Sequence, residues 1–168
     1  MNADKEAIRQ RMQEARALLL DAAAHIDDAT AGASTENPHW RVRDILAHVA
    51  GSEMGLVRTA ERFLAGGELT PGFDLDLWNQ RQIEKRQERE IAELLAELEA
   101  SRAAAWRLLD ALDAAQLAVT GRHPAGFRTS VAGIFYTIAN HELDHGNELR
   151  AALGLPITRQ ADWQEAAL

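Results

Sequence analysis

The chain of 168 residues contains no cysteine. This absence excludes disulfide bonds, thiolate metal ligands and a cysteine nucleophile, and it agrees with a reducing compartment. The sequence also lacks an apolar run near the roughly 20 residues that a membrane-spanning helix requires. Its first residues are charged and lack the apolar segment of a secretory signal. We therefore predict a cytoplasmic protein that does not enter a membrane.

A surplus of positive charge is lacking as well, because the formal net charge is -8 at pH 7. A negative field repels the phosphate groups of nucleic acids and of anionic lipids. We expect neither as a partner and expect a small-molecule ligand instead. Aromatic residues make up only 5%, but the hydrophobic share of 46% and the charged share of 26% are ordinary for a globular protein. The length fits one domain over residues 1–168.

Long segments with helical spacing of apolar residues occupy most of the chain, and the few prolines fall between them. No segment has the alternation and turns of paired strands. The predicted helices run from about Ala3 to Asp28, from just after Trp40 to about Ala65, from about Asp74 to Leu112, and from Thr129 or Ser130 to Leu153. The strongly polar part of the third, residues 79–90, is expected to project, bend or border a cleft. These features predict an all-α four-helix bundle with long connections and a short tail over residues 156–168.

The last predicted helix carries His141 and His145, four residues apart. Four residues advance a helix about 40° past one full turn, so both imidazoles leave the same face. Ile134 and Ile138 continue that face, which places the histidines on the side that should point into the core. Buried imidazoles without partners are unfavourable. The spacing is one by which a helix supplies two nitrogen ligands to a metal ion, and hydrogen bonds to nearby carboxylates are the alternative.

A third histidine, His48, follows Ile45 by three residues and borders the apolar stripe of the second predicted helix. Taken alone, it would be a core histidine with satisfied hydrogen bonds. A bundle can place its face against that of the last helix, and three neutral imidazoles then form an open metal site. We interpret the other histidines as structural or surface residues: His25, His39 and His123.

Several motifs in this order resemble the DinB/YfiT-like superfamily of metal-binding four-helix bundles. The likeness spans the chain from about Ile8 to Pro156, and the order and separation of the motifs make it specific. The matching elements are residues 40–48 opening the second helix, the pair His141 and His145, a polar third segment with Asp76-Leu-Trp78-Asn79, and residues 148–156.

The resemblance implies that His48, His141 and His145 hold one divalent ion, with zinc and nickel as the first candidates. It also implies a homodimer. Members of known activity include thiol-dependent transferases that use bacillithiol, mycothiol or related thiols, and a mycothiol-dependent maleylpyruvate isomerase. It thus predicts a transferase or isomerase of small electrophiles with a low-molecular-weight thiol as cosubstrate. Candidates for acid–base chemistry are Glu142 and Asp144, and candidates for ligand contacts are Ser52, Asn79 and Asn140.

Two alternatives are compatible with the sequence. The stretch from His141 to His145 reads His-Glu-x-x-His, the zinc-peptidase motif, in which Glu142 would be the general base and Glu148 or Glu165 the third ligand. The lack of a strand to align a peptide, the helix end near residue 154 and the absence of a role for His48 disfavour this reading. The second alternative is a non-catalytic protein whose metal is structural or whose bundle sequesters a small ligand.

Overall fold

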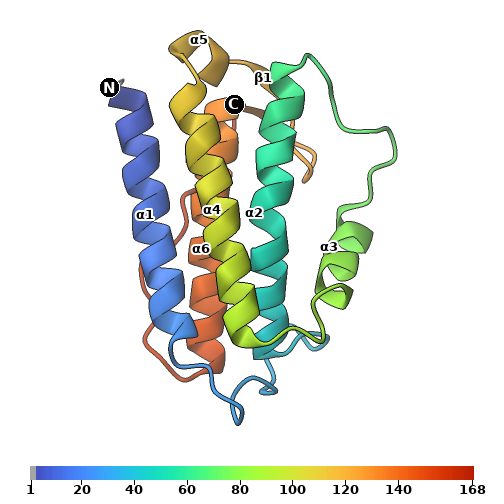
Figure 1. The fold of residues 1–168 in the computed structure, drawn as a ribbon, viewed down its shortest axis with the longest axis vertical. Coiled ribbons are helices and arrows are strands. Elements are labelled where there is room, and N and C mark those ends of the chain that lie inside the picture. The colour runs from blue at the N-terminus through green and yellow to red at the C-terminus, as the bar shows by residue number, and fades with distance from the viewer. Residues whose placement is uncertain (1–2) are drawn as a thin grey trace.

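A computed structural model describes residues 3–168. Four long helices lie side by side (Figure 1), and they are α1 (Ala3–Ala23), α2 (Val42–Leu64), α4 (Ile91–Ala111) and α6 (Val131–Ala152). In Figure 1, α1 and α6 run in one direction, whereas α2 and α4 run in the other. This arrangement confirms the predicted all-α four-helix bundle.

The core forms where the apolar stripes of these helices meet. Helix α6 packs against both α1 and α2, and α2 also packs against α4. The interior is built from large apolar side chains that are almost fully buried, among them Phe63, Phe135, Met12, Leu98 and Ile138. Because α2 and α6 are direct neighbours, residues on their facing sides meet although they lie far apart in the sequence.

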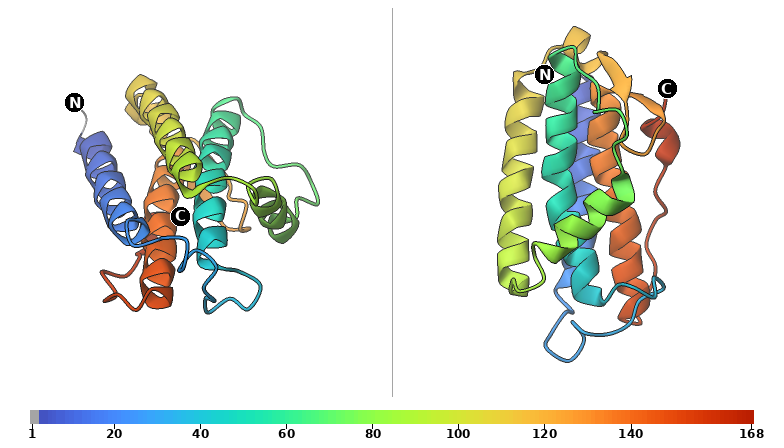
Figure 2. Two further views of the ribbon diagram at one scale, coloured as in Figure 1. Left: turned by 60° about the horizontal axis from the view of Figure 1, so that its bottom comes forward. Right: turned by 90° about the vertical axis from the view of Figure 1, so that its right-hand side faces the viewer.

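The third predicted helix, Asp74 to Leu112, is wrong as a single element. The chain forms α3 (Leu75–Glu84), then a turn, and then α4. Helix α3 stands outside the four-helix bundle, on the side of α2 (Figure 2). None of the residues Leu75–Glu84 is fully buried, so little apolar contact holds this segment in line with α4. A new helix start forms at Glu90, whose backbone N–H donates to Glu93 Oε2 at 2.8 Å.

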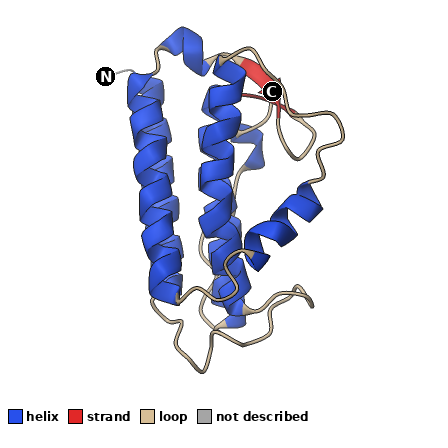
Figure 3. Cartoon of the chain, turned by 45° about the vertical axis from the view of Figure 1, so that its right-hand side comes forward, coloured by secondary structure: helices blue, strands red, loops and turns tan. Residues whose placement is uncertain are grey.

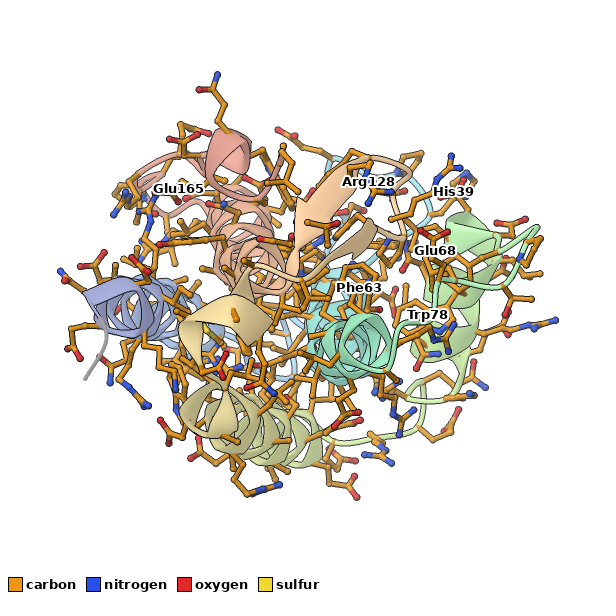
Figure 4. All side chains as sticks on the ribbon, turned by 90° about the horizontal axis from the view of Figure 1, so that it is seen from above. His39, Phe63, Glu68, Trp78, Arg128 and Glu165 are labelled. Atoms are coloured by element: carbon orange, nitrogen blue, oxygen red, sulfur yellow. The ribbon has the colours of Figure 1, made fainter. Side chains whose placement is uncertain are left out.

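The side chains of Trp78 and Arg86, in and just after α3, pack directly on two glycines of α2. A Cβ atom at Gly55 would lie 2.9 Å from the ring of Trp78, and one at Gly51 would lie 2.9 Å from Nη1 of Arg86. Both distances are too short for a real contact. Only glycine allows Trp78 to lie directly on α2, and Figure 4 shows Trp78 between α2 and α3.

The first helix ends at Ala23, earlier than the predicted Asp28. The connection over residues 113–128 contains the short helix α5 (Ala114–Leu117) and a hairpin of β1 (Thr120–Arg122) and β2 (Arg128–Ser130). No strand was predicted, and strands of three residues each are too short to show alternation. They are a small part of the chain (Figure 3). A Cβ at Gly121 would meet the Phe63 ring at 2.3 Å, so the hairpin packs tightly on α2.

The tail after α6 returns along that helix and contains the 3-10 helix η1 (Trp163–Glu165). Asn140 fixes it from α6, since its Nδ2 donates to the Asp162 carbonyl at 2.8 Å and its Oδ1 accepts from the Asp162 N–H at 3.0 Å. Across residues 3–168, no helix combines the length and apolar character needed to cross a bilayer.

Candidate metal centre

The three predicted ligands converge. His48 on α2 places its Nε2 2.9 Å from Nε2 of His141 on α6, and Nε2 of His145 lies 3.1 Å from the same atom. One ring nitrogen from each histidine lies within 4.8 Å of those of the other two. Spacing along α6 and packing of α2 on α6 therefore bring together the residues that the sequence analysis singled out.

These three ring nitrogens can bind a shared cation more readily than they can form hydrogen bonds with one another. His145 Nδ1 lies 2.7 Å from Glu148 Oε2, which places the proton of that ring on Nδ1 and leaves a lone pair on Nε2. A single proton on His141 Nε2 cannot be donated to both neighbouring rings. Two nitrogens bound tetrahedrally to one zinc ion lie roughly 3.3 Å apart, close to the separations seen here.

Glu148 and Trp40 surround the three imidazoles. A carboxylate that accepts the second N–H of a ligating histidine orients the ring and makes it a stronger ligand. Glu148 stands in this position toward His145, three residues further along the same helix. The ring of Trp40 lies 4.9 Å from that of His48 and 6.1 Å from that of His145, centroid to centroid. His48 Nδ1 is buried and has no hydrogen-bond partner within residues 3–168.

Burial keeps His48 and His141 in the neutral form that binds metals. Burial, and to a smaller extent the nearby His145, lowers the pKa of His48 to about 3. The pKa of His141 also lies well below its ordinary value, first because of burial and then because of His145, His48 and His123. These two neutral imidazoles offer lone pairs at physiological pH, so neither has to lose a proton before a metal binds.

The three-histidine cluster opens into a cavity of about 560 Å3. This volume matches sites for small organic molecules. Side chains from α2 and α6, the connection before α3, α3 itself, the hairpin loop and η1 form its walls. The apolar part of the wall is supplied mainly by large side chains, namely Trp40, Leu56, Leu69, Phe73, Leu75, Trp78 and Trp163.

His123 is a residue whose role the sequence analysis missed. It was interpreted as structural or surface, yet it is only 6% exposed and lines the cavity. Its Nδ1 accepts the Ala125 N–H at 3.0 Å, which places the ring proton on Nε2, and its ring stacks on Phe127 at 4.3 Å. Within the described residues, Nε2 has no partner. Burial lowers the pKa of His123 to about 4, so the ring is a neutral donor.

The structure separates the candidates for ligand contacts. Ser52 and Asn79 line the cavity, and the Ser52 hydroxyl donates to the His48 carbonyl at 2.7 Å. Asn140, as described above, is occupied by the tail. Asp144 accepts the indole N–H of Trp163 at 2.8 Å. It therefore fixes one wall of the cavity.

Glu142 lies in the bundle interior, inside a buried ionic cluster with Arg16, Glu53 and Arg102. Its Oε1 is 2.6 Å from Arg16 Nη2, and its Oε2 is 2.8 Å from Arg102 Nη2. Glu53 closes the cluster at 2.6 Å from each arginine. Burial raises the pKa of Glu142, and the two arginines oppose this shift. The four residues come from four helices, so the cluster ties the bundle together.

The fold resembles several solved structures. YfiT from Bacillus subtilis, described as a probable metal-dependent hydrolase with an unusual four-helix bundle topology, has a TM-score of 0.72 at 20% identity, covering 93% of this chain and 91% of that one. An uncharacterised protein from Escherichia coli UTI89 has a TM-score of 0.70 at 12% identity, covering 89% and 92%. These identities establish a shared fold.

The mycothiol-dependent maleylpyruvate isomerase has a TM-score of 0.69 at 16% identity over 84% of this chain. The match spans 60% of the isomerase, so this chain corresponds to only part of that protein. A comparison with curated proteins returns no match. A family model described as the DinB superfamily matches residues 11–149. Since that match covers most of the chain and agrees with the bundle built here, the protein belongs to the DinB superfamily.

Proposed function

We propose that this protein is a single-metal enzyme that joins a small thiol to an electrophilic molecule, or isomerises such a molecule with a thiol as cosubstrate. The observation that carries the proposal is the convergence of three imidazole nitrogens beside a cavity of about 560 Å3. A divalent ion held by His48, His141 and His145 would stabilise a thiolate at neutral pH or polarise a carbonyl group. Zinc and nickel both suit these ligands.

The surrounding side chains would orient the reactants and exclude water. Trp40 and Trp163 form walls close to the centre, and Trp78 and Phe73 form walls from the side of α3. His123 would offer a neutral N–H to an oxygen atom of the substrate, because its proton sits on Nε2 and its ring is held by Phe127. Positioned donors of this kind stabilise developing negative charge. The chain itself contains no cysteine, so the reacting sulfur would come from the cosubstrate.

The peptidase alternative receives less support. In that chemistry Glu142 would activate water beside the metal, but its carboxylate is held by Arg16 and Arg102 in the bundle interior. Hydrolysis of a small molecule is a second candidate, favoured by the description of YfiT as a probable metal-dependent hydrolase. The thiol-dependent reaction and hydrolysis differ in whether activity needs added thiol.

The test begins with elemental analysis of the purified protein and of His48→Ala, His141→Ala and His145→Ala. We expect one divalent ion per chain in the parent and its loss in each variant. The zinc-loaded protein is then incubated with chlorodinitrobenzene and a panel of thiols such as N-acetylcysteine and cysteinyl glucosamine. Product formation should need both thiol and metal and should fall about a hundredfold in His48→Ala.

His39→Ala, which alters an exposed histidine, is the matched control and should keep both metal and activity. Turnover of ester or amide substrates without any thiol would support the hydrolase instead. Metal binding without turnover of either substrate class would support a non-catalytic role. The predicted homodimer is tested separately by light scattering.

A further inference from the structure

The charge of the residues that line the cavity differs from that of the protein as a whole. The whole chain has 26 acidic and 18 basic residues. Among the described residues that line the cavity there are two arginines, Arg58 and Arg62, and no aspartate or glutamate. Within residues 3–168, neither guanidinium has a hydrogen bond or an ion pair with another residue. The cavity therefore has a positive part in a molecule of net charge -8.

These arginines lie at a defined place relative to the metal centre. One face of α2 carries Ser52, Gly55, Thr59 and Arg62, each of which points within about 40° of the direction of His48. Arg58, about 80° round, borders the same face. Along the helix axis Arg58 stands roughly 15 Å beyond His48, and Arg62 roughly 21 Å.

The wall between these two ends is mostly apolar. Trp78 lies on Gly55, midway along α2 between His48 and Arg62. Leu56 of α2 and Leu75 of α3 add apolar surface beside it. Ser52 and Asn79 also line the cavity, but most of this stretch is apolar, so an alkyl or aromatic segment would gain more by burial there than a polar one.

We propose that the ligand is an elongated molecule with a thiol or another metal-binding group at one end, an apolar middle and a carboxylate or phosphate at the other end, held by Arg58 and Arg62. This inference rests on the proposed function for the metal end, whereas the anion subsite stands on the arginines. Guanidinium groups bind carboxylates and phosphates through paired N–H donors. In the free protein both groups are exposed and available.

The test uses ω-mercaptoalkanoates and the matching ω-mercaptoalkanols, which differ only in the charge of the far end. Protein loaded with Co2+ is titrated with the propyl, octyl and undecyl members of each series. Calorimetry gives the affinity, and the sulfur-to-cobalt absorption band reports the thiol at the metal. Octanoate and octanol, which carry no thiol, measure the anion subsite alone. Phosphonates of the same lengths distinguish a preference for phosphate from one for carboxylate.

We expect the octyl or undecyl acid to bind about tenfold more tightly than its alcohol, and the propyl acid to show no preference because it is too short to reach the arginines. The double variant Arg58→Gln/Arg62→Gln should reduce the preference to about one and leave the affinity for the alcohols unchanged. Arg107→Gln, an exposed arginine on α4, is the control and should behave as the parent.

An acid-to-alcohol ratio near one at every length, or a ratio that survives the double variant, would overturn the anion subsite. An arginine-dependent preference without any sulfur-to-cobalt band would support the subsite and reject the thiol-dependent function. A sulfur-to-cobalt band together with equal binding of acids and alcohols would support the thiol-dependent function and reject the anion subsite. Circular dichroism of the double variant verifies that it is folded.

Discussion

At the scale of single residues, the contact between Glu148 and His145 should set how strongly the three histidines bind a metal ion. Replacing Glu148 with Gln removes the negative charge that makes the His145 ring a stronger ligand. We expect the affinity for zinc to fall about tenfold to a hundredfold, as measured by competition with a chromophoric chelator. Glu99→Gln, which alters an exposed glutamate on α4, should keep the parent affinity. Equal affinities in the two variants would show that the contact does not tune the centre.

His123 should make the folded state sensitive to acid. Burial lowers its pKa to about 4 from an ordinary value of 6.5, so the unfolded chain takes up a proton first as the pH falls. The resulting stability is fully present above pH 6.5 and is lost between there and about pH 4. Between about pH 7 and pH 4.5, the free energy of unfolding of the parent should decrease by about 2 kcal/mol more than that of His123→Asn.

Urea denaturation of metal-free protein at several pH values measures this difference. In His123→Asn the amide oxygen can replace Nδ1 as the acceptor of the Ala125 N–H, so the loop is kept. His39→Asn, at an exposed site, should follow the parent. Parallel curves for the parent and His123→Asn would show that the buried ring does not contribute.

The sequence predicted part of this site. The grouping of His141 with His145 follows from the helical period, whereas His48 was added because a bundle can bring its helix face against theirs and because of the family resemblance. His123 could not be found in this way, because its position depends on a hairpin whose strands pair residues across a short loop. Likewise, nothing in the order of residues placed Glu142 beside two arginines from other helices. Contacts of that kind are decided by tertiary packing.

At the scale of elements, the ionic cluster decides how the helices hold together. Arg16, Glu53, Arg102 and Glu142 come from α1, α2, α4 and α6, and all are buried. Glu142→Gln leaves two buried guanidinium groups with too little compensating charge, so the free energy of unfolding should fall by about 3 to 5 kcal/mol. Thermal or urea unfolding measures the loss.

The same variant should still bind zinc when folded, because Glu142 lies away from the imidazoles in the bundle interior. Elemental analysis at low temperature checks this point, with Glu99→Gln as the control. A Glu142→Gln protein of unchanged stability that had lost a hydrolytic activity would contradict the structural role and favour the peptidase chemistry.

The spacing of apolar residues predicted the main helices, but it did not predict where the third one is interrupted. The turn between α3 and α4 replaces a predicted continuous helix, because a polar stretch with good helix formers gives the same local signal whether or not it packs on the bundle. The packing of the α3 region on Gly51 and Gly55 depends on the close approach of Arg86 and Trp78 to α2. Only the three-dimensional arrangement reveals it.

At the scale of the whole molecule, metal binding should raise the thermal stability. A ligand that binds only the folded state, at a hundred times its dissociation constant, adds about 2.7 kcal/mol. For a chain of this size that corresponds to a rise of roughly 5 to 10 °C in Tm. We expect this rise with zinc in the parent, and none in His141→Ala. Equal shifts in both, measured by scanning calorimetry, would indicate binding elsewhere on the surface.

The three-histidine cluster also joins residues that are synthesised at very different times. His48 and His141 are 93 positions apart, and His141 and His145 lie on the last long helix. At about 5 to 20 residues per second, the ribosome releases the first ligand roughly 5 to 20 seconds before the others. Until then the nascent chain presents only His48 of the three, and a single imidazole binds a metal ion weakly. A site with all three imidazoles exists only once α6 has docked on α2, so an ion bound by all three would reach the folded bundle through the cavity.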